Sequence, residues 1–455
     1  MDQQQQAGQD KPVREREAQV EARPLDDVAT ALAEHEGMRL FIEAIPESRS
    51  MDSKRPALKK EFLSRPDKAA AREALKAKLA LWQRLLKDAD GVDALLKAAQ
   101  DRKKAVEKTM KANQKTALES TAELAESYGA LARFFLNIGE TGEGKLHFLN
   151  AEREQIGDMQ GKKFFQAVTD FVVERYRQFD LAKNIGGIVL PGMIGGKDTV
   201  SLYSKLAYDN MCRLYTDYRN YDTFEDLKKE FAEENIAAAD KELANTVMTA
   251  VWMEGRKGDK ELGVEPVYLP GSMFMAAKRY EAREKGNIAQ PTFGERYGSV
   301  NGASEVKLDL RKDQVEALAE MGLVVAQKVR GKVVFYGDES LHRGSKLERR
   351  KYYIVQLDDW IFKVMTDYGN RRAGELNKDS MRKDVREQIQ KFMNGLKAAG
   401  VIEKVVEVDV QQNREKEDET DISIKYVPYK AARVFNIHGQ ALDGKSGGTW
   451  DKGEQ

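Results

Sequence analysis

Apolar residues recur at helical spacing through the first third of the chain. Pro66 opens this pattern, and Leu75, Leu79 and Trp82 follow at intervals of three or four residues, with Lys and Arg between them. Such spacing is typical of an amphipathic helix, and proline is favoured at the first helical position. Because the pattern continues to about residue 137, we expect this part of the chain to be almost entirely helical.

The middle of the chain, from about residue 145 to 300, alternates helical stretches with short apolar runs such as 187–190 and 247–252. Alternation of this kind indicates a mixed sheet covered by helices. Residues 305–310 (EVKLDL) have the pattern of a further strand. The fold class that we expect is therefore α/β mixed (α+β).

Two apolar runs on either side of Arg330 and Gly331 predict a β-hairpin, and Gly322 predicts the end of the helix before it. After this hairpin two helical stripes follow, one beginning at Trp360 and the other at Val385. Each stripe gives its helix a face to bury.

The last 55 residues carry the clearest strand pattern. Two runs alternate apolar and polar residues around a charged loop, Pro428 breaks the pairing, and a third run follows it. Strands separated in this way fit edge pairing between different chains. The residues that we expect at such an interface are Val406, Val408, Ile422, Ile424, Tyr426, Val434, Phe435 and Ile437.

The amino end begins with a Gln-rich, charged stretch that has too few large apolar residues to order itself. Leu25, Val28 and Leu32 then form a short amphipathic stretch that fits a docking helix, although a plain packed helix explains it nearly as well. The predicted organisation is a disordered leader (1–24), a helical region (25–150), an α/β core (151–400), inter-subunit strands (401–440) and a flexible tail (441–455).

Composition and charge narrow the class of protein. Hydrophobic residues make up 41% and charged residues 33% of the chain, and 75 basic residues balance 75 acidic ones. No global positive field draws such a chain onto nucleic acid or an anionic membrane. No apolar run is long enough for direct membrane insertion, so we expect a cytoplasmic protein. Cys212 is the only cysteine, and its Tyr-rich surroundings predict a buried structural thiol.

The glycine-rich loop 186–199 (GGIVLPGMIGGKDT) is the most suggestive chemical motif, because a strand, a glycine-rich loop and a lysine form phosphate cradles. Its spacing fails, since Pro191 replaces a required glycine and Asp198 replaces Ser or Thr. The four histidines lack metal-ligand spacing, and no catalytic acid, base or nucleophile stands out. The sequence thus predicts no enzyme, metal or cofactor, while a nucleotide-binding enzyme using this loop and a non-polymerising helical scaffold remain alternatives.

Four segments together resemble the large contractile sheath subunit of type VI secretion systems (TssC/VipB-like), in particular its Bacteroidetes-type branch. They are MGLVVAQKVRGKVVFYG, KYYIVQLDDWIFKVMTDYGNRRAGE, IQKFMNGLKAAGVIEK and ISIKYVPYKAARVFNIHG. The central VLPGMIG and the early AAREALKAKLALWQRLL also fit.

The resemblance implies a structural subunit that assembles with a small sheath subunit (TssB/VipA-like) around an inner tube (Hcp-like) and contracts to propel it. It further implies contact with other copies of the chain and with a baseplate. Residues 25–150 are then expected to contact the small subunit, and the basic pair Arg371 and Arg372 is a candidate for facing the tube. In this family an AAA+ unfoldase (ClpV-like) recycles the sheath, and Leu25, Val28 and Leu32 are the candidate recognition helix.

Overall fold

The computed structural model describes residues 66–87, 91–139, 146–158, 162–178, 180–286, 288–433, 440–442 and 449–451. The predicted docking stretch at Leu25, Val28 and Leu32 therefore lies outside the described residues, as do Val434, Phe435 and Ile437. The chain divides into two compact units, residues 1–117 and 118–455, which are described separately.

The first unit is helical where it is described, as the sequence predicts. It contains the 3₁₀ turn η1 (Pro66–Lys68), helix α4 (Ala69–Lys87) and most of α5 (Val92–Ser120). With 29 residues, α5 is about 44 Å long at 1.5 Å per residue. Its apolar residues Leu96, Val106 and Met110 are all exposed. These three side chains therefore contribute little packing energy against the described part of the chain.

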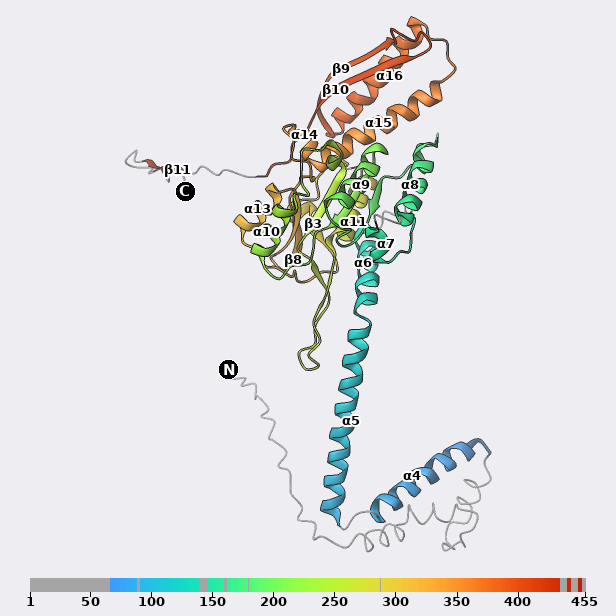
Figure 1. Cartoon of the computed structure of the whole chain (residues 1–455), viewed down its shortest axis with the longest axis vertical. Helices are drawn as coiled ribbons and strands as arrows, with labels where there is room; N and C mark the ends of the chain where they lie inside the picture. Colours follow the sequence, from blue (N-terminus) through green and yellow to red (C-terminus); the bar gives the residue numbers. More distant parts are fainter. Residues whose placement is uncertain are drawn as a thin grey trace, which may run out of the picture. The chain divides into compact units, whose positions relative to one another are not determined.

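The second unit is built on a six-stranded sheet of order β1-β2-β3-β7-β8-β6. Figure 1 labels β3 and β8 of this sheet. Its strands are β1 (Gly187–Val189), β2 (Arg213–Asp217), β3 (Thr246–Ala250), β7 (Leu323–Val329), β8 (Lys332–Tyr336) and β6 (Ser299–Val300). The first four run parallel, while β8 pairs antiparallel with β7 and with β6. The mixed sheet confirms the predicted fold class.

Both faces of this sheet are covered, because successive side chains of its inner strands point into two different cores. Val247 and Val324 belong to one apolar cluster, whereas Met248 and Val325 belong to the other. The helices of this unit are α6 (Ala122–Ile138), α7 (Arg153–Gly157), α8 (Lys163–Tyr176), α9 (Lys197–Asp209), α10 (Phe224–Glu234), α11 (Gly271–Glu284), α12 (Gly294–Tyr297), α13 (Lys312–Glu320) and α14 (Leu347–Arg350). Shorter elements are η2 (Leu181–Lys183), η3 (Lys241–Asn245) and the paired strands β4 (Met253–Arg256) and β5 (Val267–Leu269).

A further layer follows the sheet in the chain. Helices α15 (Tyr352–Arg372) and α16 (Asp379–Ala398) lead into an antiparallel strand pair, β9 (Ile402–Gln412) and β10 (Thr420–Pro428). Its core joins Leu357 and Ile361 of α15 with Val385, Ile389 and Met393 of α16 and with Ile402, Val408 and Val410 of β9. A short pair, β11 (Gln440–Leu442) and β12 (Thr449–Asp451), lies near the end of the chain.

The sequence predicted the tight turns correctly where glycine marked them. Arg330 and Gly331 have φ angles of 50° and 79°, the left-handed turn that joins β7 to β8, and Gly322 has φ 96° after α13. The predicted strand at 305–310 is wrong, because only an isolated bridge between Met253 and Val306 forms there.

Asp217 connects four segments of the second unit. Its fully buried carboxylate accepts hydrogen bonds from the Gly192 amide (2.8 Å), the Ser272 amide (2.7 Å), the Ser272 hydroxyl (2.5 Å) and the Thr249 hydroxyl. Burial raises the pKa of Asp217 above its ordinary value, although the donated hydrogen bonds oppose the shift. This one side chain connects the loop after β1, strands β2 and β3, and the start of α11.

We expect Asp217→Ala to lower the free energy of unfolding by about 4 kcal/mol, because four buried donors would lose their acceptor. Urea unfolding of the purified chain measures this loss. The matched control is Asp222→Ala, since Asp222 is exposed and its ion pair with Lys307 lies at the surface; it should change stability by less than about 0.5 kcal/mol. Equal losses in the two variants would contradict the role assigned to Asp217.

Candidate functional site

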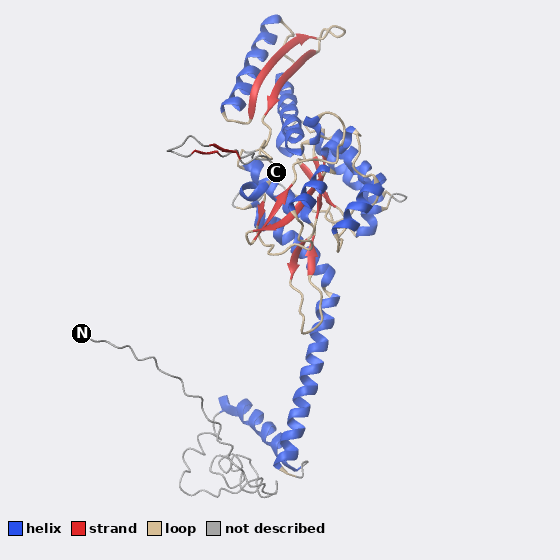
Figure 2. Cartoon of the chain, turned by 90° about the vertical axis from the view of Figure 1, so that its left-hand side faces the viewer, coloured by secondary structure: helices blue, strands red, loops and turns tan. Residues whose placement is uncertain are grey.

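The strand pair β9–β10 is the most distinctive candidate for assembly. The two strands pair along their whole length, from Thr420 with Gln412 to Pro428 with Ile402. Among the described residues neither strand has a second neighbour, so one edge of each carries unpaired backbone groups. Figure 2 shows the two long strands curving beside a helix, with no third strand along them. Such an edge is a template for another strand.

The two faces of this strand pair differ. Val408 and Val410 are buried, and Ile424 and Tyr426 pack partly against the same core. A register shift between Lys425 and Tyr426 interrupts the ladder opposite Val406.

Val406 is consequently 57% exposed, and Val405 packs against the core in its place. The alternation of apolar and polar residues predicted that Val406 and Val408 share one face of the strand. The bulge at Val406 interrupts this alternation. Ile422 is also exposed, at 36%. Val406, Ile422 and Val427, which is also 36% exposed, are therefore the apolar residues of this pair that remain open to a neighbour.

A hydrogen bond fixes the strand pair to α15. The Tyr426 hydroxyl donates to Asp358, which follows the buried Leu357 on the helix. Burial raises the pKa of Asp358 to about 6; the hydrogen bond from Tyr426 opposes the shift, and the neighbouring Asp359 carboxylate adds to it. The junction thus holds a carboxyl group that ionises at a higher pH than an exposed aspartate.

A buried ionic cluster holds the chain where it leaves β10. Asp338 and Glu339 are almost fully buried, and Lys351 lies 2.8 Å from Asp338 and 3.0 Å from Glu339. Arg343 and Arg350 also pair with Glu339. Burial alone would raise the pKa of Glu339, but the hydrogen bonds from Lys351, Arg350 and Arg343 lower it to about 2.

The segment after β10 is tied to this cluster from outside. Arg433 lies 3.7 Å from both Asp338 and Glu339, and the Ala431 amide donates to the Tyr353 hydroxyl at 3.0 Å. Arg349, Arg350 and Lys351 form a basic run in the sequence. Lys351 is buried and Arg350 pairs with Glu339, so this run stabilises the fold of the chain itself.

Arg371 and Arg372 occupy the last turn of α15 and behave differently. Arg371 is exposed and pairs with Asp367 at 2.7 Å on the same helix. Arg372 lies 2.7 Å from both Glu375 and Asp384, so it connects α15 with α16. Of the two, only Arg371 presents its guanidinium mainly to solvent.

An apolar stripe runs along α6. Leu124 is 69% and Tyr128 71% exposed, and Phe135 extends the same helical face to the exposed Phe148, with ring centroids 6.4 Å apart. The opposite face is buried, since Gly129 lets Leu269 approach the helix closely. Exposed apolar residues that follow one helical face are typical of a docking surface.

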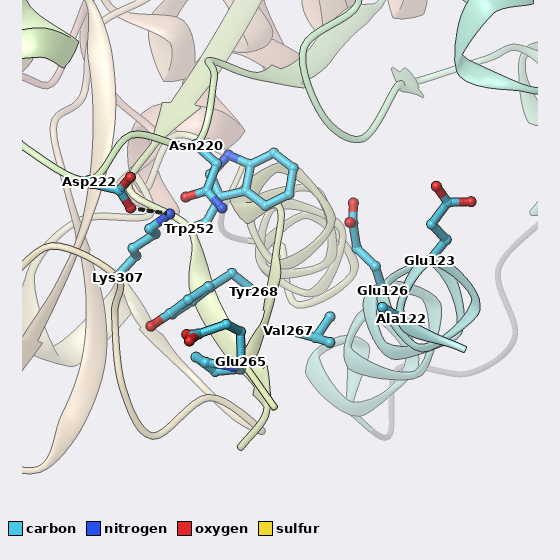
Figure 3. A pocket seen from close by; sticks show the side chains of 11 residues that line it. Ala122, Glu123, Glu126, Asn220, Asp222, Trp252, Glu265, Val267, Tyr268 and Lys307 are labelled. Carbon is cyan, nitrogen blue, oxygen red and sulfur yellow. Dashed lines mark ion pairs between the residues drawn. The ribbon is translucent and has the colours of Figure 1, made fainter. Parts of the chain in front are cut away.

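A cavity of about 630 Å³ lies beyond the carboxyl ends of β2 and β3 (Figure 3). Glu123 and Glu126 come from α6, and Glu265 lies on the opposite wall. Asp222 pairs with Lys307 at 2.7 Å, so the acidic side chains outnumber the single basic one on this wall. A site of this sign repels the phosphates of a nucleotide.

The glycine-rich loop 186–199 is used by the fold itself. The Gly192 amide, which would face a phosphate in a nucleotide-binding loop, donates to Asp217. Gly195 has φ 134° and lies against the Thr199 side chain. Within the described ranges no three His, Cys, Asp or Glu side chains gather to hold a metal ion. Cys212 is buried as predicted, and burial raises the pKa of its thiol to about 11.

Three family models match the chain in succession. The TssC/VipB-like N-terminal region matches residues 25–114, the type VI secretion system TssC/VipB central domain matches 116–343, and the TssC/VipB-like C-terminal domain matches 351–455. The chain belongs to the TssC/VipB family. The family predicted from the sequence is thereby confirmed, and the Bacteroidetes-type branch stays a prediction.

Solved structures share the fold at low sequence identity. A chain of the anti-feeding prophage baseplate is 16% identical with a TM-score of 0.50, over 68% of this chain and 78% of that one. A chain of the anti-feeding prophage helical sheath in the contracted state is 14% identical with a TM-score of 0.48, over 68% and 80%. The search of curated proteins gave no match.

Membership of the TssC/VipB family makes the chain a contractile sheath subunit of type VI secretion, as predicted, and favours neither the enzyme nor the scaffold alternative. In the described part of the chain, no helix is long and apolar enough to cross a membrane.

Sequence reasoning missed three features of this TssC/VipB chain: the Tyr426–Asp358 contact, the Arg433 anchor and the bulge at Val406. The first two join residues that are far apart in the sequence, so no local pattern reveals them. The bulge had a weak signal, because Val405 and Val406 are adjacent valines that leave the register undecided.

Asp358→Asn should make the chain more stable at neutral pH. Since burial raises the pKa of Asp358 from 3.8 to about 6, the folded chain keeps a proton that the unfolded chain releases between these values. The stability that the protonated Asp358 contributes to the folded chain is therefore present below about pH 4 and lost as the pH rises through about 6. We expect the variant to gain about 2 kcal/mol in its free energy of unfolding at about pH 7.5, because Asn carries no charge to bury and still accepts from Tyr426. The gain should be smaller at about pH 4.5, where the Asp358 carboxyl group is itself mostly protonated.

Urea unfolding at both pH values measures this difference. The matched control is Asp418→Asn, because Asp418 is exposed in the loop between β9 and β10. It should change stability by less than about 0.5 kcal/mol at either pH. A gain that does not depend on pH in Asp358→Asn would show that this carboxyl group does not titrate as described.

Proposed function

We propose that the chain pairs with a small sheath subunit (TssB/VipA-like), and that these pairs stack into a helical sheath around an inner tube (Hcp-like). The observation that supports this most directly is the two-stranded sheet β9–β10, whose outer edges find no partner among the described residues. Strands from neighbouring chains would complete that sheet, joining one subunit to the next through backbone hydrogen bonds.

The predicted interface strands agree with this proposal in different ways. Val406 and Ile422 are open apolar positions, as is Val427. Val408, Ile424 and Tyr426 pack toward α16 and hold the pair in shape. The run Val434, Phe435 and Ile437 follows directly after the Arg433 anchor, so it is the candidate strand to be donated to a neighbour.

This arrangement suits contraction. Backbone ladders between chains keep their partners while the bodies that carry them rotate, so a sheath can shorten without coming apart. In this proposal the extended sheath is metastable, and contraction releases it to better-packed interfaces without nucleotide hydrolysis. The role is structural rather than catalytic, in the bacterial cytoplasm, with one end of the sheath on a baseplate.

The small subunit would dock on the apolar stripe of α6, within the helical region 25–150. The exposed Leu124, Tyr128 and Phe135 give this helix a face with nothing to bury it in the described part of the chain. Covering such a face with another helix is the usual means of removing it from water.

Two further contacts complete the proposal. Arg371, exposed at the end of α15, is the better candidate for facing the tube, because Arg372 is engaged between α15 and α16. Leu25, Val28 and Leu32 remain the candidate helix for an AAA+ unfoldase (ClpV-like).

Electron microscopy of the chain expressed with its small partner should show hollow cylinders. We expect Ile422→Asp to reduce their number more than about tenfold, because a charge at this partly open apolar position, opposite Val410, opposes burial against a neighbouring chain. Folding should be spared, with a loss below about 1 kcal/mol, since Ile422 is already exposed.

The matched control is Ser423→Asp, the next residue on the same strand and also exposed. It lies on the opposite side of β10, beside the ion pair of Lys425 with Glu407, and should leave cylinders intact. Normal cylinders from Ile422→Asp would count against the proposed interface. Small uniform particles from the wild-type pair would contradict the function.

The double variant Leu124→Asp/Tyr128→Asp should lose the small partner. Two charges on the α6 stripe would each need desolvation in the complex, so we expect the amount of partner that co-purifies to fall more than about tenfold. Affinity purification through a tag on this chain measures it, with circular dichroism to confirm the fold.

Ser127→Asp is the matched control, because Ser127 is exposed on the same helix but lies to one side of the stripe. Full retention of the small partner by the double variant would place its docking surface elsewhere.

A further inference from the structure

A small cavity of about 30 Å³ lies at the beginning of β2, where α15 passes the turn that precedes β1. Its walls include Arg213 of β2, Arg283 of α11, and Asp359 and Lys363 of α15. A water molecule needs roughly 10–15 Å³ of such space, so the cavity has room for one small ion or about two waters. It is too small for a nucleotide or any comparable organic ligand.

Arg213 is the unusual member of this wall. The residue is 1% exposed, yet its Nε and Nη2 atoms have no hydrogen-bond partner. Nη2 lies 3.0 Å from the Asp359 carboxylate as an ion pair without hydrogen-bond geometry, and Nη1 makes only a long contact of 3.5 Å to the Cys212 carbonyl. Buried polar groups are almost always partnered, so this guanidinium has room for a further acceptor.

The charges around the cavity favour an anion. Three basic side chains, Arg213, Arg283 and Lys363, face a single carboxylate, Asp359, which also accepts from Asn245. Arg213 is buried and Lys363 partly buried, whereas Arg283 is exposed. The cost of unbalanced positive charge inside the protein therefore falls on Arg213 and Lys363, and a bound anion would reduce it.

Two details hold the basic groups in position. Lys363 donates to the Asn184 side chain at 2.6 Å and to the Ile185 carbonyl at 2.9 Å, which fixes its ammonium at the cavity wall. Gly186 admits the Arg283 guanidinium, since a Cβ at this position would lie 2.3 Å from Nη1. Burial lowers the pKa of Lys363 to about 8, so the ammonium stays mostly charged at neutral pH.

We infer that this cavity binds one small inorganic anion of the halide class, held by Arg213 together with Arg283 and Lys363. The anion would accept from Arg213 Nε and offset the excess positive charge between β2, α11 and α15. Because α15 carries the strand pair β9–β10 through the Tyr426–Asp358 contact, the ion would stiffen the connection between the main sheet and the assembly strands. This inference is independent of the proposed sheath contacts.

The test compares thermal unfolding of the full chain in sodium chloride and in sodium gluconate at equal ionic strength, since gluconate is too large for the cavity. We expect the chloride-minus-gluconate difference in Tm to be about 3 °C larger in the wild type than in Arg283→Gln or Lys363→Gln. Lys285→Gln is the matched control, because Lys285 follows α11 but pairs with Glu281 away from the cavity; it should respond like the wild type.

Crystals of the wild-type chain grown in sodium bromide give a second measurement that does not depend on any variant folding. An anomalous peak beside Arg213 Nε would support the site. Water there without an anomalous peak would overturn the inference, as would an equal salt response in the wild type and Arg283→Gln.

Discussion

A backbone amide or carbonyl needs a hydrogen-bond partner, and the strand pair β9–β10 meets this requirement only on its inner side. Two strands alone are marginal in water, and this pair is stable because α16 covers one face through Val385, Ile389 and Met393. The same packing leaves the outer edges open. Stability within the chain and readiness to bind another chain therefore come from one arrangement.

Buried polar groups at the joints of this fold serve its architecture, although their residue types also occur in active sites. Asp217 accepts donors from the loop after β1, from β3 and from α11. A carboxylate with Ser and Thr neighbours could be mistaken for catalytic machinery, but here every contact is internal. The acidic lining of the cavity between α6 and the carboxyl ends of β2 and β3 likewise argues against a phosphate ligand.

Features that depend on neighbouring residues could be predicted from the sequence, whereas features that join segments far apart in the chain could not. Helix faces and the Arg330–Gly331 hairpin depend on neighbouring residues, and both were predicted correctly. The segment 305–310 alternates like a strand, yet Leu308 and Leu310 pack into the core while the Gln327 side chain binds the Leu310 backbone. Strand pairing there is replaced by a side chain from a distant element, which no local pattern encodes.

At the candidate interface, too, the local pattern was predicted and the contacts between distant segments were not. The alternation around Ile424 and Tyr426 correctly indicated a strand. Which apolar residues stay open, Val406, Ile422 and Val427, depends on the register shifts and on how far α16 extends. Family resemblance supplied the biological role, which no residue pattern alone would have given. Cavities and ionic clusters could not be foreseen, because they form only when remote segments meet.

The anchor at Arg433 determines how the molecule bears mechanical load. Arg433 and the Ala431 amide attach the departing segment to Asp338, Glu339 and Tyr353, which belong to the main body rather than to β10. A pull on the chain beyond this point therefore reaches the buried core first, and the ladder between β9 and β10 is shielded from peeling. Neighbouring subunits can therefore pull on this segment without separating β9 from β10.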